Sequence, residues 1–217
     1  MAKIRRDNRS SQRDQAYMGL RRLLILQQVE PGERLREPAW SKRLGVHRSA
    51  LREALARLEA EGMVERGART GYFVPELSPT DVLEITKLRL AFECLAIDEI
   101  CADPKSHPLK KIATACKEFE QFSRAGYSLG ATEADRRFHE AIINGAKLRR
   151  LSSLYSRAPL PLIHGHTEDP AIWAESCKRT AKEHRQVLEA LKRHDAKAAK
   201  AILHDHLMQR SILPMCR

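Results

Sequence analysis

Residues 45–62 read GVHRSALREALARLEAEG and have the spacing of an amphipathic helix. One apolar stripe is formed by three leucines at helical intervals, Leu51, Leu55 and Leu58. Arg48 and Arg52 lie four residues apart on another face, beside Ser49. A shorter helix is expected over residues 37–44, before a glycine-containing turn. This order predicts a helix-turn-helix, in which the start of the second helix reads base edges in the major groove.

A solvated surface helix would show the same pattern, so the interpretation as a DNA-binding helix depends on the residues that follow it. Residues 63–66 and 72–74 are short strand-like runs, joined by a loop with Arg69 near its tip. A hairpin directly after the second helix is typical of the wing of a winged helix. Arg66 or Arg69 would then contact a phosphate or the minor groove.

Composition favours a polyanionic partner and excludes several classes of protein. The chain has 217 residues, a formal net charge of +11 and a pI of about 9.7. The N-terminus has no apolar signal segment, and no apolar run approaches the ~18 residues of a membrane span. The cysteines are odd in number and lack CxxC spacing; the five are Cys94, Cys101, Cys116, Cys177 and Cys216. They indicate reduced thiols and a cytoplasmic protein.

The predicted architecture is mostly α: an N-terminal winged helix-turn-helix followed by an all-α helical bundle. We expect a flexible basic arm over 1–13, the DNA-binding domain over 14–75, a linker over 76–78 and the bundle over 79–217. Ser78, Pro79 and Asp81 form a strong helix start. The predicted helices span residues 14–27, 37–44, 47–62, 79–102, 107–125, 130–145, 148–160, 170–192 and 195–211.

Four polar residues occupy inward-facing stripes of the predicted bundle helices. Asp135 and His139 are four residues apart, so both can reach one point. His184 and His206 lie among apolar residues on two later helices. An unpartnered polar group in such a place costs about 1–3 kcal/mol or more. One carboxylate and three imidazoles together predict a divalent transition-metal site, with zinc as first choice and nickel, manganese or iron as alternatives.

Other interpretations stay open at this point. Taken singly, each of the four residues is better explained as a buried histidine bonded to a carbonyl or as a surface aspartate, and only their occurrence together favours a metal site. A metal-dependent hydrolase or oxygenase would also use such ligands, with an open coordination position and a base. A DNA-binding protein whose bundle only dimerises is a third possibility. His164 and His166 fall in an expected loop, where solvated histidines are favoured over a second metal clip.

The chain resembles the GntR family of transcription regulators, FadR subfamily, with an FCD-type sensor domain of the six-helix, VanR-like group. In the first half the resemblance rests on residues 44–64 and on Arg69-Thr-Gly-Tyr-Phe-Val74. In the second half it rests on Leu88-Arg-Leu-Ala-Phe-Glu, Asp135-Arg-Arg-Phe-His139, Glu183-His-Arg-Gln-Val-Leu-Glu-Ala-Leu and His206-Leu207. The match covers nearly the whole chain after residue 14.

The resemblance implies a bacterial, homodimeric regulator, rather than an enzyme, that reads an inverted repeat in double-stranded DNA. The family's operator contacts fall on Arg48, Ser49 and Arg52, with Gly71 of the wing close to the DNA backbone. We expect His47 and Arg69 to contact DNA as well. Its metal ligands fall on Asp135, His139, His184 and His206. Arg89 would meet the carboxylate of a small organic-acid effector, and most such proteins are repressors. The chain departs from the family at two positions, with His47 in place of Ser or Thr and Pro38 in place of Arg or Lys. Two consequences stay open: a changed reading of the operator, or pH sensitivity through the imidazole.

Overall fold

The structure, a computed structural model, describes residues 11–67, 71–102, 109–158 and 169–212. The chain divides into two compact units, Met1–Glu76 and Leu77–Arg217. Among the described residues, no helix is both long and apolar enough to span a membrane. The described cysteines are Cys94, Cys101, Cys116 and Cys177, of which Cys116 and Cys177 are buried, and Cys216 lies outside the described part.

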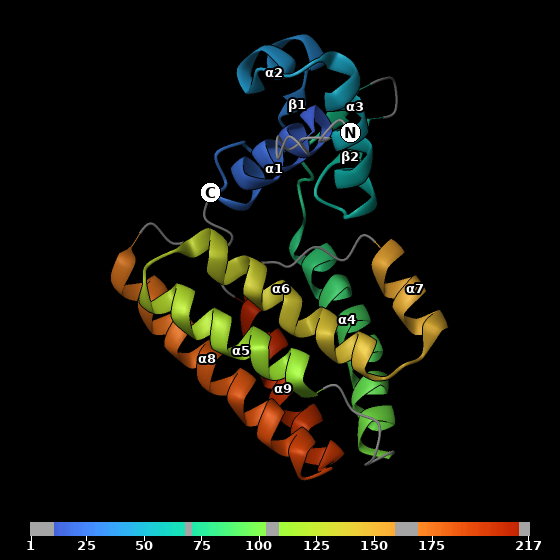
Figure 1. Cartoon of the computed structure of the whole chain (residues 1–217), viewed down its shortest axis with the longest axis vertical. Coiled ribbons are helices and arrows are strands. Elements are labelled where there is room, and N and C mark those ends of the chain that lie inside the picture. The colour runs from blue at the N-terminus through green and yellow to red at the C-terminus, as the bar shows by residue number, and fades with distance from the viewer. Residues whose placement is uncertain (1–10, 68–70, 103–108, 159–168, 213–217) are drawn as a thin grey trace, which may run out of the picture. The chain divides into compact units, whose positions relative to one another are not determined.

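The first unit has the element order of a winged helix. Its elements are α1 (Gln12–Ile25), β1 (Arg34–Leu35), α2 (Glu37–Leu44), α3 (Arg48–Ala60), β2 (Glu65–Arg66) and β3 (Tyr72–Phe73) (Figure 1). Helix α2 ends at Gly45, whose φ of 66° is the left-handed conformation that glycine adopts without strain. That turn brings α3 onto α1 and α2. The two predicted helices and the hairpin are therefore confirmed.

The hairpin belongs to a three-stranded antiparallel sheet in the order β1-β3-β2. Strand β3 pairs with β2 through Glu65 and Phe73, and with β1 through Arg34 and Phe73. Strand β1 was not predicted, because two residues are too few to show an alternating pattern. It fixes the wing to the segment that precedes α2.

The core of the first unit forms around the apolar stripe of α3. Leu51, Leu55 and Leu58 are all fully buried, as their spacing predicts. Trp40 of α2 packs against them and is 4% exposed. The opposite face of α3 is thereby turned outward.

The second unit consists of helices in the described residues. They are α4 (Pro79–Ala102), α5 (Leu109–Arg124), α6 (Ser128–Gly145), α7 (Arg149–Arg157), α8 (Pro170–Lys192) and α9 (Ala196–Ile212). Ser78 and Asp81 form the predicted capping interaction at the start of α4, where the Asp81 carboxylate accepts from the Ser78 backbone N–H at 2.8 Å. Asp169 is the N-cap residue of α8, and its carboxylate accepts from the backbone N–H of Ala171.

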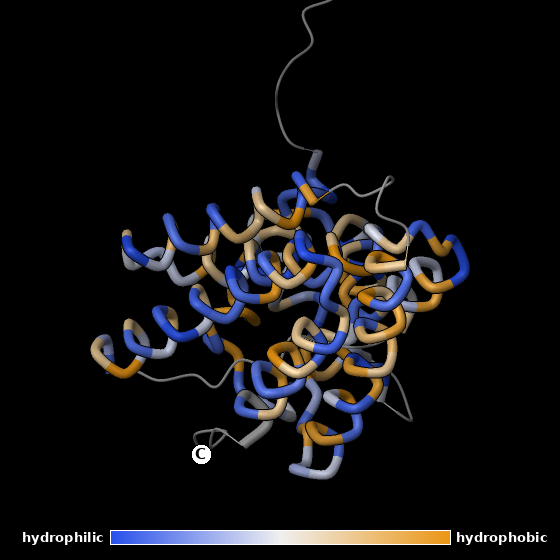
Figure 2. The backbone as a smooth tube through the Cα atoms, turned by 90° about the horizontal axis from the view of Figure 1, so that it is seen from below, coloured by the Kyte–Doolittle hydropathy of each residue, from blue (hydrophilic) through white to orange (hydrophobic). Residues whose placement is uncertain are grey.

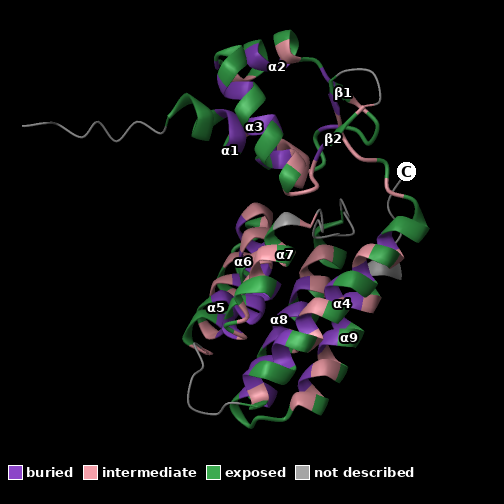
Figure 3. Ribbon diagram, turned by 90° about the vertical axis from the view of Figure 1, so that its right-hand side faces the viewer, coloured by how far each residue is buried: buried purple, intermediate pink, exposed green. Residues whose placement is uncertain are grey.

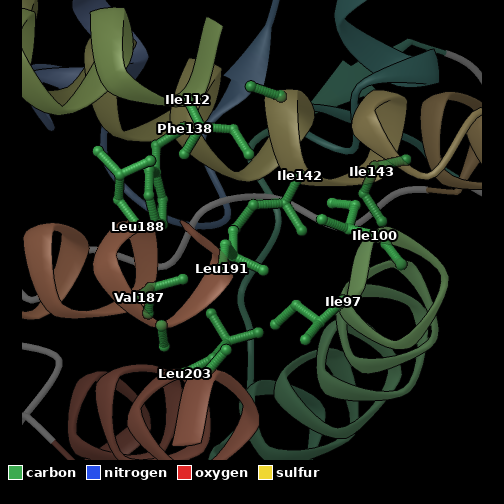
Figure 4. Close-up of a cluster of buried hydrophobic side chains, with 14 of the residues drawn as sticks. Ile97, Ile100, Ile112, Phe138, Ile142, Ile143, Val187, Leu188, Leu191 and Leu203 are labelled. Carbon is green, nitrogen blue, oxygen red and sulfur yellow. The ribbon is translucent and has the colours of Figure 1, made fainter. Parts of the chain in front are cut away.

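All six of these helices contribute side chains to one apolar core, α7 through Leu151. Helix α5 packs along α6 and α8, and α9 packs along α4 and α8 (Figure 1). Figure 4 shows side chains from α4, α5, α6, α8 and α9 meeting in this core, including Ile97, Ile142, Leu191 and Leu203. Hydrophobic residues recur among hydrophilic ones along the helices (Figure 2), and buried residues recur among exposed ones (Figure 3). This core holds the next group of residues in place.

Candidate functional site

Four polar side chains lie inside the helical unit among apolar neighbours. Asp135 and His139 come from α6, His184 from α8 and His206 from α9. All four are at most 2% exposed. Their placement follows from the helical stripes, since each lies three or four residues from a buried apolar residue on the same helix face, as Asp135 does from Phe138.

The four side chains converge on one point. Each offers a ligand atom, and these atoms all lie within 4.8 Å of one another. His184 Nε2 is 3.2 Å from Asp135 Oδ1, and His139 Nε2 is 3.9 Å from the same oxygen. The Nε2 atoms of His139 and His206 are 3.4 Å apart. A carboxylate oxygen and three imidazole nitrogens are a donor set that suits zinc, nickel, manganese or iron.

Two further carboxylates contact two of the imidazoles at Nδ1, the ring nitrogen that faces away from the common point. Glu93 Oε2 of α4 lies 2.6 Å from His139 Nδ1. Glu183 Oε2 of α8 lies 2.7 Å from His206 Nδ1. A carboxylate on the far nitrogen of a histidine fixes its tautomer and orientation, and this arrangement is typical of metal-bound histidines.

These contacts determine which nitrogens face the common point. We assign the proton of each ring to Nδ1, because a carboxylate there accepts it. The Nε2 atoms of His139 and His206 then both present lone pairs, at the 3.4 Å separation given above. A metal ion between them would remove the repulsion, so the residues present fit such an ion.

His184 is held by packing. Its ring stacks on Phe138 with centroids 3.8 Å apart and an interplanar angle of 16°, and the Phe119 ring lies 5.1 Å away, edge to face. The Cys116 thiol donates to the His184 carbonyl at 3.7 Å. Burial raises the pKa of Cys116 to about 12, so this thiol stays protonated, and it is not among the four converging residues.

Arg89, the predicted effector residue, lies beside this cluster. It is 4% exposed, and its Nη2 donates to Glu93 Oε1 at 3.0 Å. Tyr155 of α7 donates to the same oxygen at 3.2 Å. Burial opposes the charged form of Glu93, but His139 and Arg89 outweigh it and hold the pKa of this carboxyl below its usual value. Burial likewise opposes the charge on Arg89, yet Tyr155, Glu93 and Asp135 raise its pKa further above the ordinary range.

The Glu183→Gln substitution tests the role of the outer carboxylates. The amide cannot accept the Nδ1 proton of His206 as strongly, so we expect zinc affinity to fall by about 10–100-fold, the usual cost of losing such a partner. Competition with a chromophoric chelator measures it. Glu175→Gln, an exposed site on the same helix, is the matched control. Equal affinity in both variants would contradict the assigned role of Glu183.

The outward face of α3 carries the residues predicted to read DNA. Arg48, Ser49 and Arg52 are all exposed. The Arg52 side chain is 66% exposed, and its Nε pairs with Glu37 Oε2 of α2 at 2.6 Å. This ion pair orients the guanidinium on the surface of the helix, which its sequence spacing alone did not indicate.

The remaining predicted DNA contacts are placed unequally. His47 is exposed and directly precedes α3, where its backbone N–H donates to Gln12 Oε1 at 2.9 Å. Gly71 is exposed at the start of β3, with a φ of 103°. Arg69 lies outside the described residues, as do His164, His166 and most of the 1–13 arm.

Comparison with known proteins decides the class of this chain. Residues 84–209, more than half of the chain, match the FCD domain. Residues 12–74 match the bacterial regulatory proteins of the gntR family. The chain belongs to the GntR family.

Relatives of this GntR-family protein are transcriptional regulators. The uncharacterized HTH-type transcriptional regulator YdhC of Bacillus subtilis (strain 168) is 30% identical over 192 residues, covering 86% of this chain and 83% of the relative. The Uxu operon transcriptional regulator of Escherichia coli (strain K12) is 27% identical over 224 residues, covering 91% and 85%. The solved structure of E. coli McbR/YncC shares the fold, with a TM-score of 0.67, 22% identity, and coverage of 93% and 95%.

The comparisons confirm the predicted family, fold class and function as a DNA-binding transcriptional regulator, and they give no support to the enzyme interpretation. The structure brings the four predicted ligands together beside Arg89. Sequence reasoning missed Glu93, Glu183 and Tyr155 as parts of the site. Glu93 is four residues after Arg89 on one helix face, which was the available signal for the pair.

Proposed function

We propose that this GntR-family regulator binds an inverted-repeat operator as a homodimer, and that a small carboxylate bound at a divalent metal in the FCD domain lowers its operator affinity. The protein then acts as a repressor that the acid releases. One observation carries the proposal: four buried ligands, two of them backed by carboxylates, lie next to a buried arginine.

Each component has a distinct task. The metal, held by Asp135, His139, His184 and His206, would supply a Lewis acid for an oxygen ligand. Arg89 would supply a fixed positive charge to the same acid. Among the described residues no acceptor reaches Arg89 Nε, a buried donor that a carboxylate oxygen would satisfy.

On the DNA side, each protomer of the dimer would make the same contacts to its own half-site. Arg48 and Arg52 of each α3 would enter one half-site, where an arginine fork pairs with guanine O6 and N7. Ser49 would contact the backbone or a base edge, while His47, Arg69 and Gly71 complete the proposed DNA surface. A probable D-xylose utilization operon transcriptional repressor of Paenarthrobacter nicotinovorans, 23% identical over 180 residues, is consistent with repression here.

Operator binding with and without metal tests the proposal. A duplex selected by the protein itself from random DNA is titrated against zinc-loaded and metal-free protein, in the presence of a panel of small carboxylic acids. We expect at least one acid to weaken operator binding by the zinc-loaded protein by about 5–150-fold, the usual range for coupled sites. The same acid should leave operator binding by the metal-free protein unchanged. An operator affinity that changes with no acid and is the same with and without metal would instead support a bundle that only dimerises.

A further inference from the structure

The buried groups around the proposed metal site have an unequal charge count. Arg89, Glu93 and Asp135 are at most 4% exposed, and they contribute one positive and two negative charges. Glu183 lies at the edge, with its side chain 14% exposed and 3.8 Å from the guanidinium of Arg179, which offsets it. Histidines that ligate a metal are neutral. A divalent ion therefore leaves the buried site with one net positive charge.

Glu93 supplies one of the two buried negative charges, and without it the net charge of the metal-loaded site would be two. Its Oε2 binds His139, while its Oε1 accepts from both Arg89 and Tyr155. Three donors on a carboxylate that is 0% exposed keep it ionised and fixed. One edge of the Arg89 guanidinium is thereby occupied, and Nε is left as a buried donor with no acceptor among the described residues.

We propose that Glu93 sets the charge class of the effector, so that the metal-loaded site selects a monocarboxylate over a dicarboxylate. The inference rests on the proposed function. A single carboxylate neutralises the remaining positive charge and satisfies Arg89 Nε. A second carboxylate would be an excess charge in a buried site, which is costly unless it is paired. Glu93 does not contact the acid; it acts through Arg89 and the charge of the site.

Two acids of equal chain length test the proposal. Butyrate and succinate are titrated into zinc-loaded full-length protein by calorimetry, and the ratio of their dissociation constants is compared between wild type and Glu93→Gln. Wild type should bind butyrate more tightly. The amide removes one negative charge, so the ratio should move toward succinate by about tenfold or more, the size of effect that a neighbouring charge has on a buried equilibrium.

Glu183→Gln is the matched control, since it changes the other outer carboxylate at the screened edge of the site. It should lower zinc affinity but move the butyrate-to-succinate ratio much less than Glu93→Gln does. An equal ratio in wild type and Glu93→Gln would overturn the proposal. So would a wild type that prefers succinate, a result that needs no variant to fold. Failure of wild type to bind zinc would contradict the proposed function instead, whereas zinc-loaded wild type that binds succinate and not butyrate, or neither acid, would overturn only the present proposal.

Discussion

The His139→Ala protein is expected to lose tight zinc binding and to unfold at a lower temperature than zinc-loaded wild type. An ion present at about a thousand times its dissociation constant stabilises the folded state by about 4 kcal/mol. Each kcal/mol shifts the melting temperature by about 2–4 °C in a domain of this size, so the loss should be roughly 8–16 °C. Differential scanning calorimetry with and without zinc measures it.

A second histidine on α9 provides the control for this variant. His204 is exposed and outside the cluster, so His204→Ala should keep the zinc-dependent rise in melting temperature. His139→Ala also removes a partner of Glu93, which is why the zinc-dependent part of the shift is the diagnostic quantity. A variant that still gains stability from zinc as wild type does would refute the assignment of His139 as a ligand.

The Arg52→Ala protein is expected to lose specific operator binding while keeping its helical content. A good bidentate contact between arginine and guanine is worth about 1–3 kcal/mol, and a dimer makes it twice. The loss for a palindromic site should therefore be about 2–6 kcal/mol, or roughly 30-fold to 10⁴-fold in affinity. Fluorescence anisotropy with the selected duplex measures it, and circular dichroism verifies folding.

Arg57 on the same helix is a charge-matched control. Its guanidinium lies 3.6 Å from the centroid of the Tyr17 ring and its Nε pairs with Glu61 at 3.4 Å, so it is engaged within the unit. Arg57→Ala removes the same charge and should weaken specific and non-specific binding alike, by a small factor. If both variants lost specific affinity to the same extent, the reading of bases by Arg52 would be wrong.

Much of the fold followed from sequence because local signals and the apolar pattern agreed. The leucine stripe of α3, the Gly45 turn and the Ser78–Asp81 cap are short-range features, and each is present in the structure. The four candidate ligands were found for the same reason. A polar residue on an inward helical stripe stands out against its apolar neighbours.

Contacts between distant segments were not predictable in this way. Strand β1 depends on pairing with β3 across the unit, and the Arg52–Glu37 pair depends on how α2 meets α3. The sequence around Glu183 and Tyr155 does not distinguish a position that faces the site from one on the exposed surface. Only the packing of α7, α8 and α9 against α4 and α6 shows that these residues face the site.

The metal content of the protein as purified tests the central claim most directly. Elemental analysis should find about one transition-metal ion per chain, as four converging ligands require. The wild-type protein after chelation should take up zinc to the same stoichiometry. Absence of metal on purification, together with no uptake of zinc, nickel, manganese or iron on titration, would contradict the account, because the buried cluster would then serve only the packing of the FCD domain.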